Sequence, residues 1–146
     1  MVVAKAGHHF GNWVIPMPKI ELTFKRIQVF YWKEPDGAEH RWSVDAAMEL
    51  IMREKLLPEI EIRLQDATDC LYKNDDAKQF IAEVNEHHDC DEPVILITHY
   101  DRFEKQDSNI LIDGWHRLAK MVKTGRTKPM LAYSLTKRQA DLIRIH

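Results

Sequence analysis

Cysteine is scarce in this chain and long apolar runs are missing, and both features restrict the class of protein. Two cysteines in 146 residues, Cys70 and Cys90, cannot form a disulfide framework, which favours a reducing cytoplasm. No apolar run approaches the roughly 18–20 residues of a membrane span, and residues 1–9 lack the apolar region of a secretory signal. Internal repeats and low-complexity segments are also missing. We therefore expect a cytoplasmic globular protein with no membrane partner.

The composition is that of an ordinary folded domain. Apolar residues make up 45% of the chain and charged residues 30%. The length fits one domain that can bury a core without disulfides or a structural metal. We expect residues 1–57 to form an N-terminal arm, hairpin and helix. They would extend an α+β domain over residues 58–146, and the two parts would pack as one compact unit.

The N-terminal third carries turn and capping signals. In chain order we expect an irregular arm over residues 1–18, a strand from Ile20 that changes face near Ile27, a turn at Pro35-Asp36-Gly37, a return strand over residues 38–42, and a helix capped by Ser43 that ends before Pro58. The helix should bury one stripe of side chains: Val44, Ala47, Met48 and Ile51. Aromatic residues at strand spacing favour a core, although they could instead form a contact surface for a protein partner: Phe24, Phe30, Tyr31, Trp32 and Trp42.

The rest of the chain alternates strand and helix patterns. We expect a strand over residues 59–64, followed by a helix from Asn74 or Asp75 that buries Ala77, Phe80, Ile81 and Val84. A strand over 94–97 and a strand over 109–112 should be joined by a polar hairpin loop over 100–108. The chain should then form a helix that ends at Gly125, a strand over 129–135 and a short helix over 136–143. This order predicts a mixed sheet with helices packed on it, an α+β or α/β domain.

Charge is distributed unevenly along a chain whose net charge is only -2. The segment from Glu54 to Glu92 carries 12 acidic and 4 basic side chains, whereas the segment from Arg117 to His146 carries 8 basic and 1 acidic side chains. A basic end on a near-neutral protein favours an anionic partner such as a phosphate, a nucleotide or a nucleic-acid backbone. The alternative is that the two segments offset each other within one fold.

Candidate functional residues are concentrated where a predicted buried strand passes into a helix, at Asp113-Gly114-Trp115-His116-Arg117. Backbone N–H groups at a helix N-terminus attract anions, and a glycine lets a ligand approach the backbone closely. An arginine one turn into the helix can add a bidentate contact to a phosphate, and a histidine can donate a hydrogen bond or transfer a proton. The same residues could instead be a plain helix cap with a packed tryptophan and a surface ion pair.

This motif resembles the signature of the ParB/sulfiredoxin superfamily. Its members share a Gly-x-x-Arg turn, which reads Gly-Glu-Arg-Arg in chromosome-partitioning proteins, Gly-Cys-His-Arg in sulfiredoxins and Asp-Gly-His-His-Arg in free serine kinases. The last form is the most similar to residues 113–117, with Trp115 in place of its first histidine. The order of predicted elements from Pro58 to Leu135 also fits the fold of the superfamily.

The resemblance implies a nucleotide-binding function. In a phosphotransferase or nucleotide hydrolase of this type, Gly114, Trp115, His116 and Arg117 would bind the phosphates of ATP or another nucleoside di- or triphosphate, together with Mg²⁺. Asp113 would hold the metal or orient His116, and Asp66, which follows the first strand of the domain, would accept a proton from the substrate hydroxyl. Sulfinic acid reduction is not expected, because Trp115 stands where sulfiredoxins have their nucleophilic cysteine.

Two other functions remain open at this stage. The chain could be a non-catalytic accessory or regulatory module of the same fold, as mobile elements or phages encode. It could also be a ParB-like DNA-binding protein or nuclease that uses the basic C-terminal third, although a pI near 6.4 argues against this. Histidine-based zinc sites at His8 and His9, or at His87, His88 and Cys90, are disfavoured because neither group has an evident full ligand set.

Overall fold

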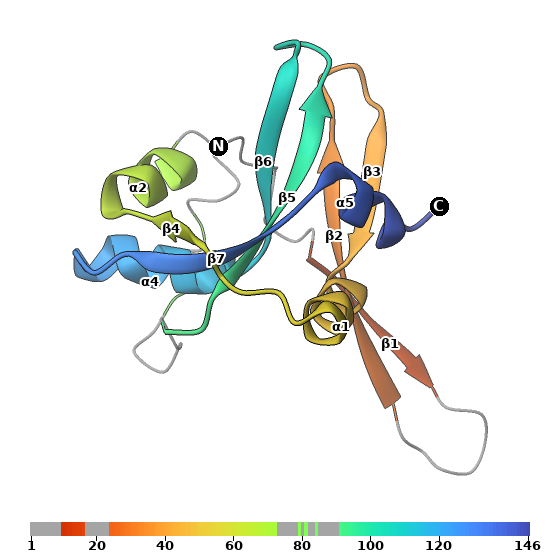
Figure 1. Cartoon of the computed structure of the whole chain (residues 1–146), viewed down its shortest axis with the longest axis horizontal. Helices are drawn as coiled ribbons and strands as arrows, with labels where there is room; N and C mark the ends of the chain where they lie inside the picture. The colour runs from red at the N-terminus through yellow and green to blue at the C-terminus, as the bar shows by residue number, and fades with distance from the viewer. Residues whose placement is uncertain (1–9, 17–23, 73–78, 80, 82–83, 85–90) are drawn as a thin grey trace.

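The computed structural model describes residues 10–16, 24–72, 79, 81, 84 and 91–146, and shows a mixed α/β protein with two sheets (Figure 1). The first sheet has three antiparallel strands in chain order: β1 (Phe10–Pro16), β2 (Phe24–Lys33) and β3 (Glu39–Ser43). The second sheet has four strands in the order β4 (Ile60–Ile62), β7 (Met130–Leu135), β5 (Val94–Asp101) and β6 (Gln106–Asp113). A mixed sheet with packed helices is therefore confirmed at this level.

The predicted β2–β3 hairpin is confirmed. Its turn contains Gly37 at a φ of 94°, a conformation that glycine adopts without strain, and Oδ1 of Asp36 accepts a hydrogen bond from the backbone N–H of Ala38 at 3.0 Å. The prediction of an irregular arm is wrong for residues 10–16, which form β1 and pair with residues 24–30 of β2. Backbone pairing with a neighbouring strand outweighed the local glycine and proline signals. Residues 1–9 and 17–23 lie outside the described part.

Helix α1 (Val44–Glu54) begins and ends where the sequence indicates. The side chain of Ser43 accepts a hydrogen bond from the N–H of Ala46 at 3.0 Å, and Lys55 ends the helix in the left-handed conformation. The buried stripe consists of Val44, Ala47, Leu50 and Ile51. The prediction that Met48 belongs to this stripe is wrong, because its side chain is 42% exposed. The stripe includes Leu50 instead.

The second sheet combines one parallel pair with two antiparallel pairs. Strand β5 runs parallel to β7 and antiparallel to β6, while β4 runs antiparallel to β7. The loop between β5 and β6 spans only residues 102–105, so most of the segment expected as a polar loop over 100–108 is paired strand. These polar residues form a partly exposed two-stranded extension beyond the buried run from Val94 to Ile97, in which Ser108 is buried.

Three further helices have bounds within the described residues: α2 (Leu64–Tyr72), α4 (Trp115–Thr124) and α5 (Lys137–Leu142). Gln79 and Ile81 are also helical, as the sequence predicts for this segment. Helix α2 packs against α4, and α5 packs against β5 (Figure 1). The C-cap at Gly125 and the capping box at Thr136 and Gln139 are confirmed. Helix α2 was not predicted, although its buried residues Ala67, Cys70 and Leu71 have helical spacing. The predicted start at Asn74 or Asp75, Ala77 and Phe80 lie outside the described residues.

Both parts of the chain contribute to one hydrophobic cluster. Phe30 and Trp42 from the first sheet are buried together with Ile97 and Ile112 from the second. Backbone hydrogen bonds join the C-terminal segment to β3: the N–H of Ser43 donates to the carbonyl of Ile143, and that of Ile145 donates to the carbonyl of Arg41, both at 2.9 Å. Trp32 is buried as well, so these three aromatic residues of the hairpin lie in the core rather than on a contact surface.

Candidate functional site

The strand-to-helix junction expected to hold an anion is present in the structure. Strand β6 ends at Asp113, Gly114 is the N-cap with φ 106° and ψ 19°, and α4 begins at Trp115. A Cβ atom at Gly114 would lie 2.3 Å from Cγ1 of Val94 and 3.1 Å from Nη2 of Arg117. A side chain at this position would clash with Val94 of β5 and crowd the Arg117 guanidinium, so the packing of the protein itself requires a glycine here, whether or not a ligand also approaches.

Arg117 is held in place by groups around the junction. Its Nη2 lies 3.1 Å from Oδ2 of Asp113 and donates a hydrogen bond to the carbonyl of Pro93 at 3.2 Å, while Nη1 lies 3.8 Å from Oε2 of Glu92. Asp113 is buried, and burial raises its pKa although Arg117 opposes the shift. Asp113 therefore does not cap α4 but orients Arg117. Arg117 contacts Oδ2 of Asp113, and a role of this carboxylate as a Mg²⁺ ligand stays a prediction.

The other predicted phosphate contacts differ in exposure. Trp115 is 1% exposed, and its ring stacks on Phe30 with 6.3 Å between the centroids and an interplanar angle of 13°. A ring in this position packs α4 against the first sheet rather than lining a ligand surface. His116, in the first turn of α4, is half-buried and remains within reach of solvent.

Asp66 follows β4 and Asp113 ends β6, and the C-terminal ends of these two strands lie on the same side of the second sheet. It is exposed in the first turn of α2, where Oδ2 accepts a hydrogen bond from the N–H of Arg63 at 3.4 Å. The strand order places β7 and β5 between β4 and β6, which separates β4 from β6 by roughly 14 Å at the usual strand spacing. The structure thus brings Asp113, Gly114 and Arg117 together, while the proton-accepting role of Asp66 stays a prediction.

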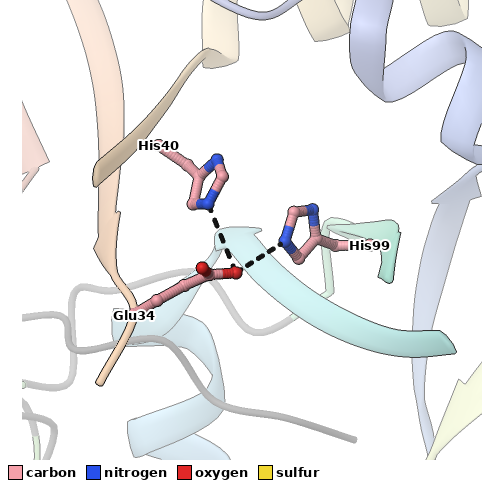
Figure 2. Close-up of side chains that lie close together, drawn as sticks. All are labelled: Glu34, His40 and His99. Carbon is pink, nitrogen blue, oxygen red and sulfur yellow. Dashed lines mark hydrogen bonds and ion pairs between the residues drawn. The ribbon is translucent and has the colours of Figure 1, made fainter. Parts of the chain in front are cut away.

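A second group of functional side chains was missed by the sequence reasoning. Glu34, His40 and His99 offer one carboxylate oxygen and two ring nitrogens that all lie within 4.8 Å of one another (Figure 2). Nε2 of each histidine lies 3.4 Å from Oε1 of Glu34. We call these three residues the Glu–His cluster. Glu34 and His40 belong to one hairpin, but His99 is distant from both in the sequence, so only the contact between the two sheets reveals the cluster.

The backbone explains how the Glu–His cluster is assembled. Glu34 follows β2 and is fixed at both backbone groups, since its N–H donates to the carbonyl of Ala38 at 2.8 Å and its carbonyl accepts from Gly37 at 2.9 Å. His40 lies on β3 opposite Trp32, and His99 lies on β5 of the other sheet. The Trp32 ring contacts the ring of His99 edge-on with a centroid separation of 4.9 Å.

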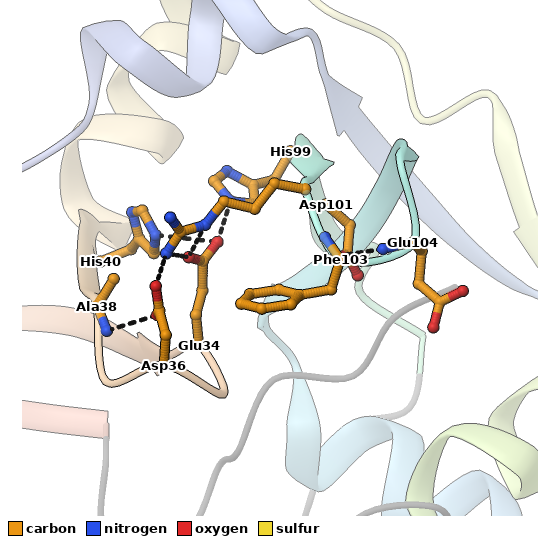
Figure 3. Close-up of polar contacts among 9 residues, drawn as sticks. Glu34, Asp36, Ala38, His40, His99, Asp101, Phe103 and Glu104 are labelled. Carbon is orange, nitrogen blue, oxygen red and sulfur yellow. Dashed lines mark hydrogen bonds and ion pairs between the residues drawn. The ribbon is translucent and has the colours of Figure 1, made fainter.

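Arginine and aspartate surround the buried carboxylate (Figure 3). Nε of Arg102 donates a hydrogen bond to Oε2 of Glu34 at 2.8 Å, its Nη2 lies 2.6 Å from the same oxygen, and Nη2 also contacts Asp36. The two oxygens of Glu34 are therefore divided between partners: Arg102 takes Oε2, and the imidazoles face Oε1.

The cluster shifts the protonation of all three members. Burial lowers the pKa of both His40 and His99, with Arg144 acting in the same direction and Glu34 opposing it. Burial alone would raise the pKa of Glu34, but hydrogen bonds from Arg102 and His99 outweigh it, so that this pKa is lowered. The cluster therefore favours neutral imidazoles beside an ionised carboxylate.

The stability of the metal-free protein is expected to fall as the pH is lowered from about 7 toward about 5. The unfolded chain takes up protons on His40 and His99 near their ordinary pKa of 6.5, whereas the folded chain, with lowered pKa values, takes them up only at lower pH. The loss is at most about 1.4 kcal/mol per pH unit for each histidine. Urea unfolding of the wild type and of the H40Q/H99Q double variant measures it. If the free energy of unfolding fell equally steeply with pH in the two proteins, the lowered pKa values of His40 and His99 would be contradicted.

Comparison with known proteins adds no relative: no protein-family model, no curated protein and no solved structure matches the chain. Among the described residues, no helix has both the length and the apolar character needed to cross a membrane.

Proposed function

We propose that this chain is a nucleotide-binding protein of the ParB/sulfiredoxin type, which holds the phosphates at the junction of β6 and α4. The order of the elements supports this: β4, α2, the strand β5 after Pro93, the hairpin to β6, the Gly-x-x-Arg helix α4 and the final strand β7. This is the order that the resemblance implies for residues 58–135.

The observation that carries the proposal is the position of the Arg117 guanidinium at the N-terminus of α4. It lies next to Gly114, where no side chain of the N-cap residue bonds to the first turn and where the first turn holds no acidic residue. The helix dipole and the guanidinium therefore favour negative charge at one place. Asp113 and the carbonyl of Pro93 hold the guanidinium there, which lowers the entropy cost of binding an anion.

The proposal covers binding and leaves catalysis aside. His116, half-buried in the same turn, would donate a hydrogen bond to the phosphate. Any Mg²⁺ would arrive on the nucleotide, coordinated mainly by phosphate oxygens and water. Two strands, β7 and β5, lie between β6 and the strand that precedes Asp66, and a proton-accepting role for Asp66 is left out of the proposal.

A panel of ATP, ADP, CTP and GTP, each with and without Mg²⁺, tests this function by thermal unfolding and calorimetry. A nucleotide at 100 times its Kd should add about 2.7 kcal/mol to the free energy of unfolding, which raises Tm by about 5–10 °C. The R117K variant removes the planar fork and keeps the charge, so we expect it to weaken binding by about tenfold or more.

The R138K variant is the matched control, since Arg138 is exposed in the first turn of α5 and lies outside the junction. It should bind nucleotide as the wild type does. Two results would overturn the proposal: no nucleotide in the panel raises Tm, or R117K binds nucleotide as tightly as the wild type and R138K do. The second result would indicate diffuse attraction to positive charge, which a lysine preserves, rather than a defined site.

A further inference from the structure

We infer that Glu34, His40 and His99 form a binding site for a divalent transition-metal cation of the zinc class, placed where the two sheets meet. This site is separate from the junction of β6 and α4, and the inference does not depend on nucleotide binding. It rests on the donor set, the distances between the donors, the hydrogen bonding of His40 and the surroundings of Glu34.

The donor set and its spacing suit such an ion. Two imidazole nitrogens and one carboxylate oxygen are the ligands of many three-residue zinc sites, which leave a fourth position to water or a ligand. Ligand atoms about 2.1 Å from a tetrahedral ion are roughly 3.4 Å apart. Both Nε2 atoms lie 3.4 Å from Oε1 of Glu34, and all three donors lie within 4.8 Å of one another. Only small movements would bring them onto one ion.

His40 provides a second, independent observation. Its side chain is 15% exposed, and both ring nitrogens are buried without a hydrogen bond. Nε2 comes within 3.4 Å of Glu34 but lacks hydrogen-bond geometry, and leaving buried polar atoms without a partner is unfavourable. A cation on Nε2 would satisfy one of these atoms. In the bound state each imidazole would carry its proton on Nδ1 and offer the Nε2 lone pair to the ion.

The surroundings keep the donors in position. Arg102 binds Oε2 of Glu34 and so leaves Oε1 turned toward the imidazoles, as a hydrogen-bonding partner of a metal-ligating carboxylate does. The ring of Trp42 stacks on His40 at a centroid separation of 5.7 Å, and Trp32 contacts His99, so that both imidazoles are restrained. Hard cations such as Mg²⁺ prefer oxygen ligands and should not compete.

Because the three ligands come from β2–β3 and from β5, the ion would join the two sheets (Figure 1). Binding of an ion to the folded chain alone raises its stability. Saturation at about 100 times Kd is therefore expected to raise Tm by about 5–10 °C. Conversely, removal of the ion by a chelator should lower Tm by the same amount.

The full chain, stripped of metal by a chelator, is titrated with Zn²⁺ in a calorimeter, and binding of Co²⁺ is followed by its visible absorption. We expect one Zn²⁺ per chain with a rise in Tm, tetrahedral Co²⁺ bands, and no response to Mg²⁺. The H99Q and H40Q variants should lose at least about tenfold in affinity. The E34Q variant, which is close in shape to the wild type, tests the carboxylate where a histidine variant fails to fold.

The H146Q variant is the control, since His146 is exposed at the C-terminus. It should bind Zn²⁺ as the wild type does. The inference is overturned if folded H99Q and E34Q bind Zn²⁺ as tightly as the wild type. It is also overturned if the H87Q/H88Q variant, rather than H99Q, abolishes binding, because the ion would then be held by another histidine pair. Loss of nucleotide binding would leave these results unchanged.

Discussion

The G114A variant is expected to lose about 4 kcal/mol of its free energy of unfolding. Gly114 has a φ of 106°, which costs a residue with a Cβ atom about 1–3 kcal/mol. The added Cβ would also lie 2.3 Å from Cγ1 and 2.7 Å from Cβ of Val94, so that β5 or the start of α4 has to move, at a further cost of about 1–3 kcal/mol. Urea unfolding monitored by circular dichroism measures the change.

The G125A variant is the matched control for G114A. Gly125 also has a positive φ, of 66°, but no atom lies within 4 Å of the position of an added Cβ. Only the conformational cost applies there, so we expect a loss of about 1 kcal/mol. If G114A and G125A lost the same free energy of unfolding, the contact between residue 114 and Val94 would not explain why glycine is needed at this position. Close approach of a ligand to the backbone would then be the remaining explanation.

The W115A variant is expected to lose a similar amount, about 4 kcal/mol. Trp115 is almost fully buried and stacks on Phe30, so truncation removes a large apolar side chain and leaves a cavity between α4 and the first sheet. The W115F variant keeps an aromatic ring and should lose less than half as much. Thermal and urea unfolding measure both variants.

The exposed Tyr72 supplies the control, because the Y72A variant removes an aromatic ring that is 53% exposed and should cost less than about 1 kcal/mol. The W115F variant also separates packing from ligand contact. If Trp115 belongs to the core, W115F binds nucleotide as the wild type does. A loss of nucleotide affinity in folded W115F would restore the direct contact that the resemblance implies.

Local signals accounted for the parts of the fold whose cause lies within a few residues. Ser43, Gly125 and the pair Thr136 and Gln139 end or begin helices in the structure as the sequence indicates, because a cap is a contact between near neighbours. The strand from Val94 to Ile97 was also predicted correctly, since a short apolar run that follows a proline and is rich in β-branched residues is typical of a buried strand.

The incorrect predictions have different physical origins. Strand β1 and the paired parts of the β5–β6 hairpin are polar or rich in turn residues, and they are strands because a neighbouring strand accepts and donates their hydrogen bonds. Ala67, Cys70 and Leu71 of helix α2 have helical spacing, but the strong alternation of residues 60–64 directly before them favoured a strand. Met48 faces solvent because α1 turns Leu50 toward the core instead.

The two candidate sites divide in the same way. By itself the sequence determined the junction at Gly114, because a strand, a glycine and a helix with Arg117 follow one another within five residues. Only the tertiary structure decided that Asp113 is committed to Arg117, that Trp115 is buried, and that His99 meets Glu34 and His40. These contacts depend on how β5 and α4 dock on the first sheet. Docking is set by the summed burial of many apolar side chains rather than by any local run of residues.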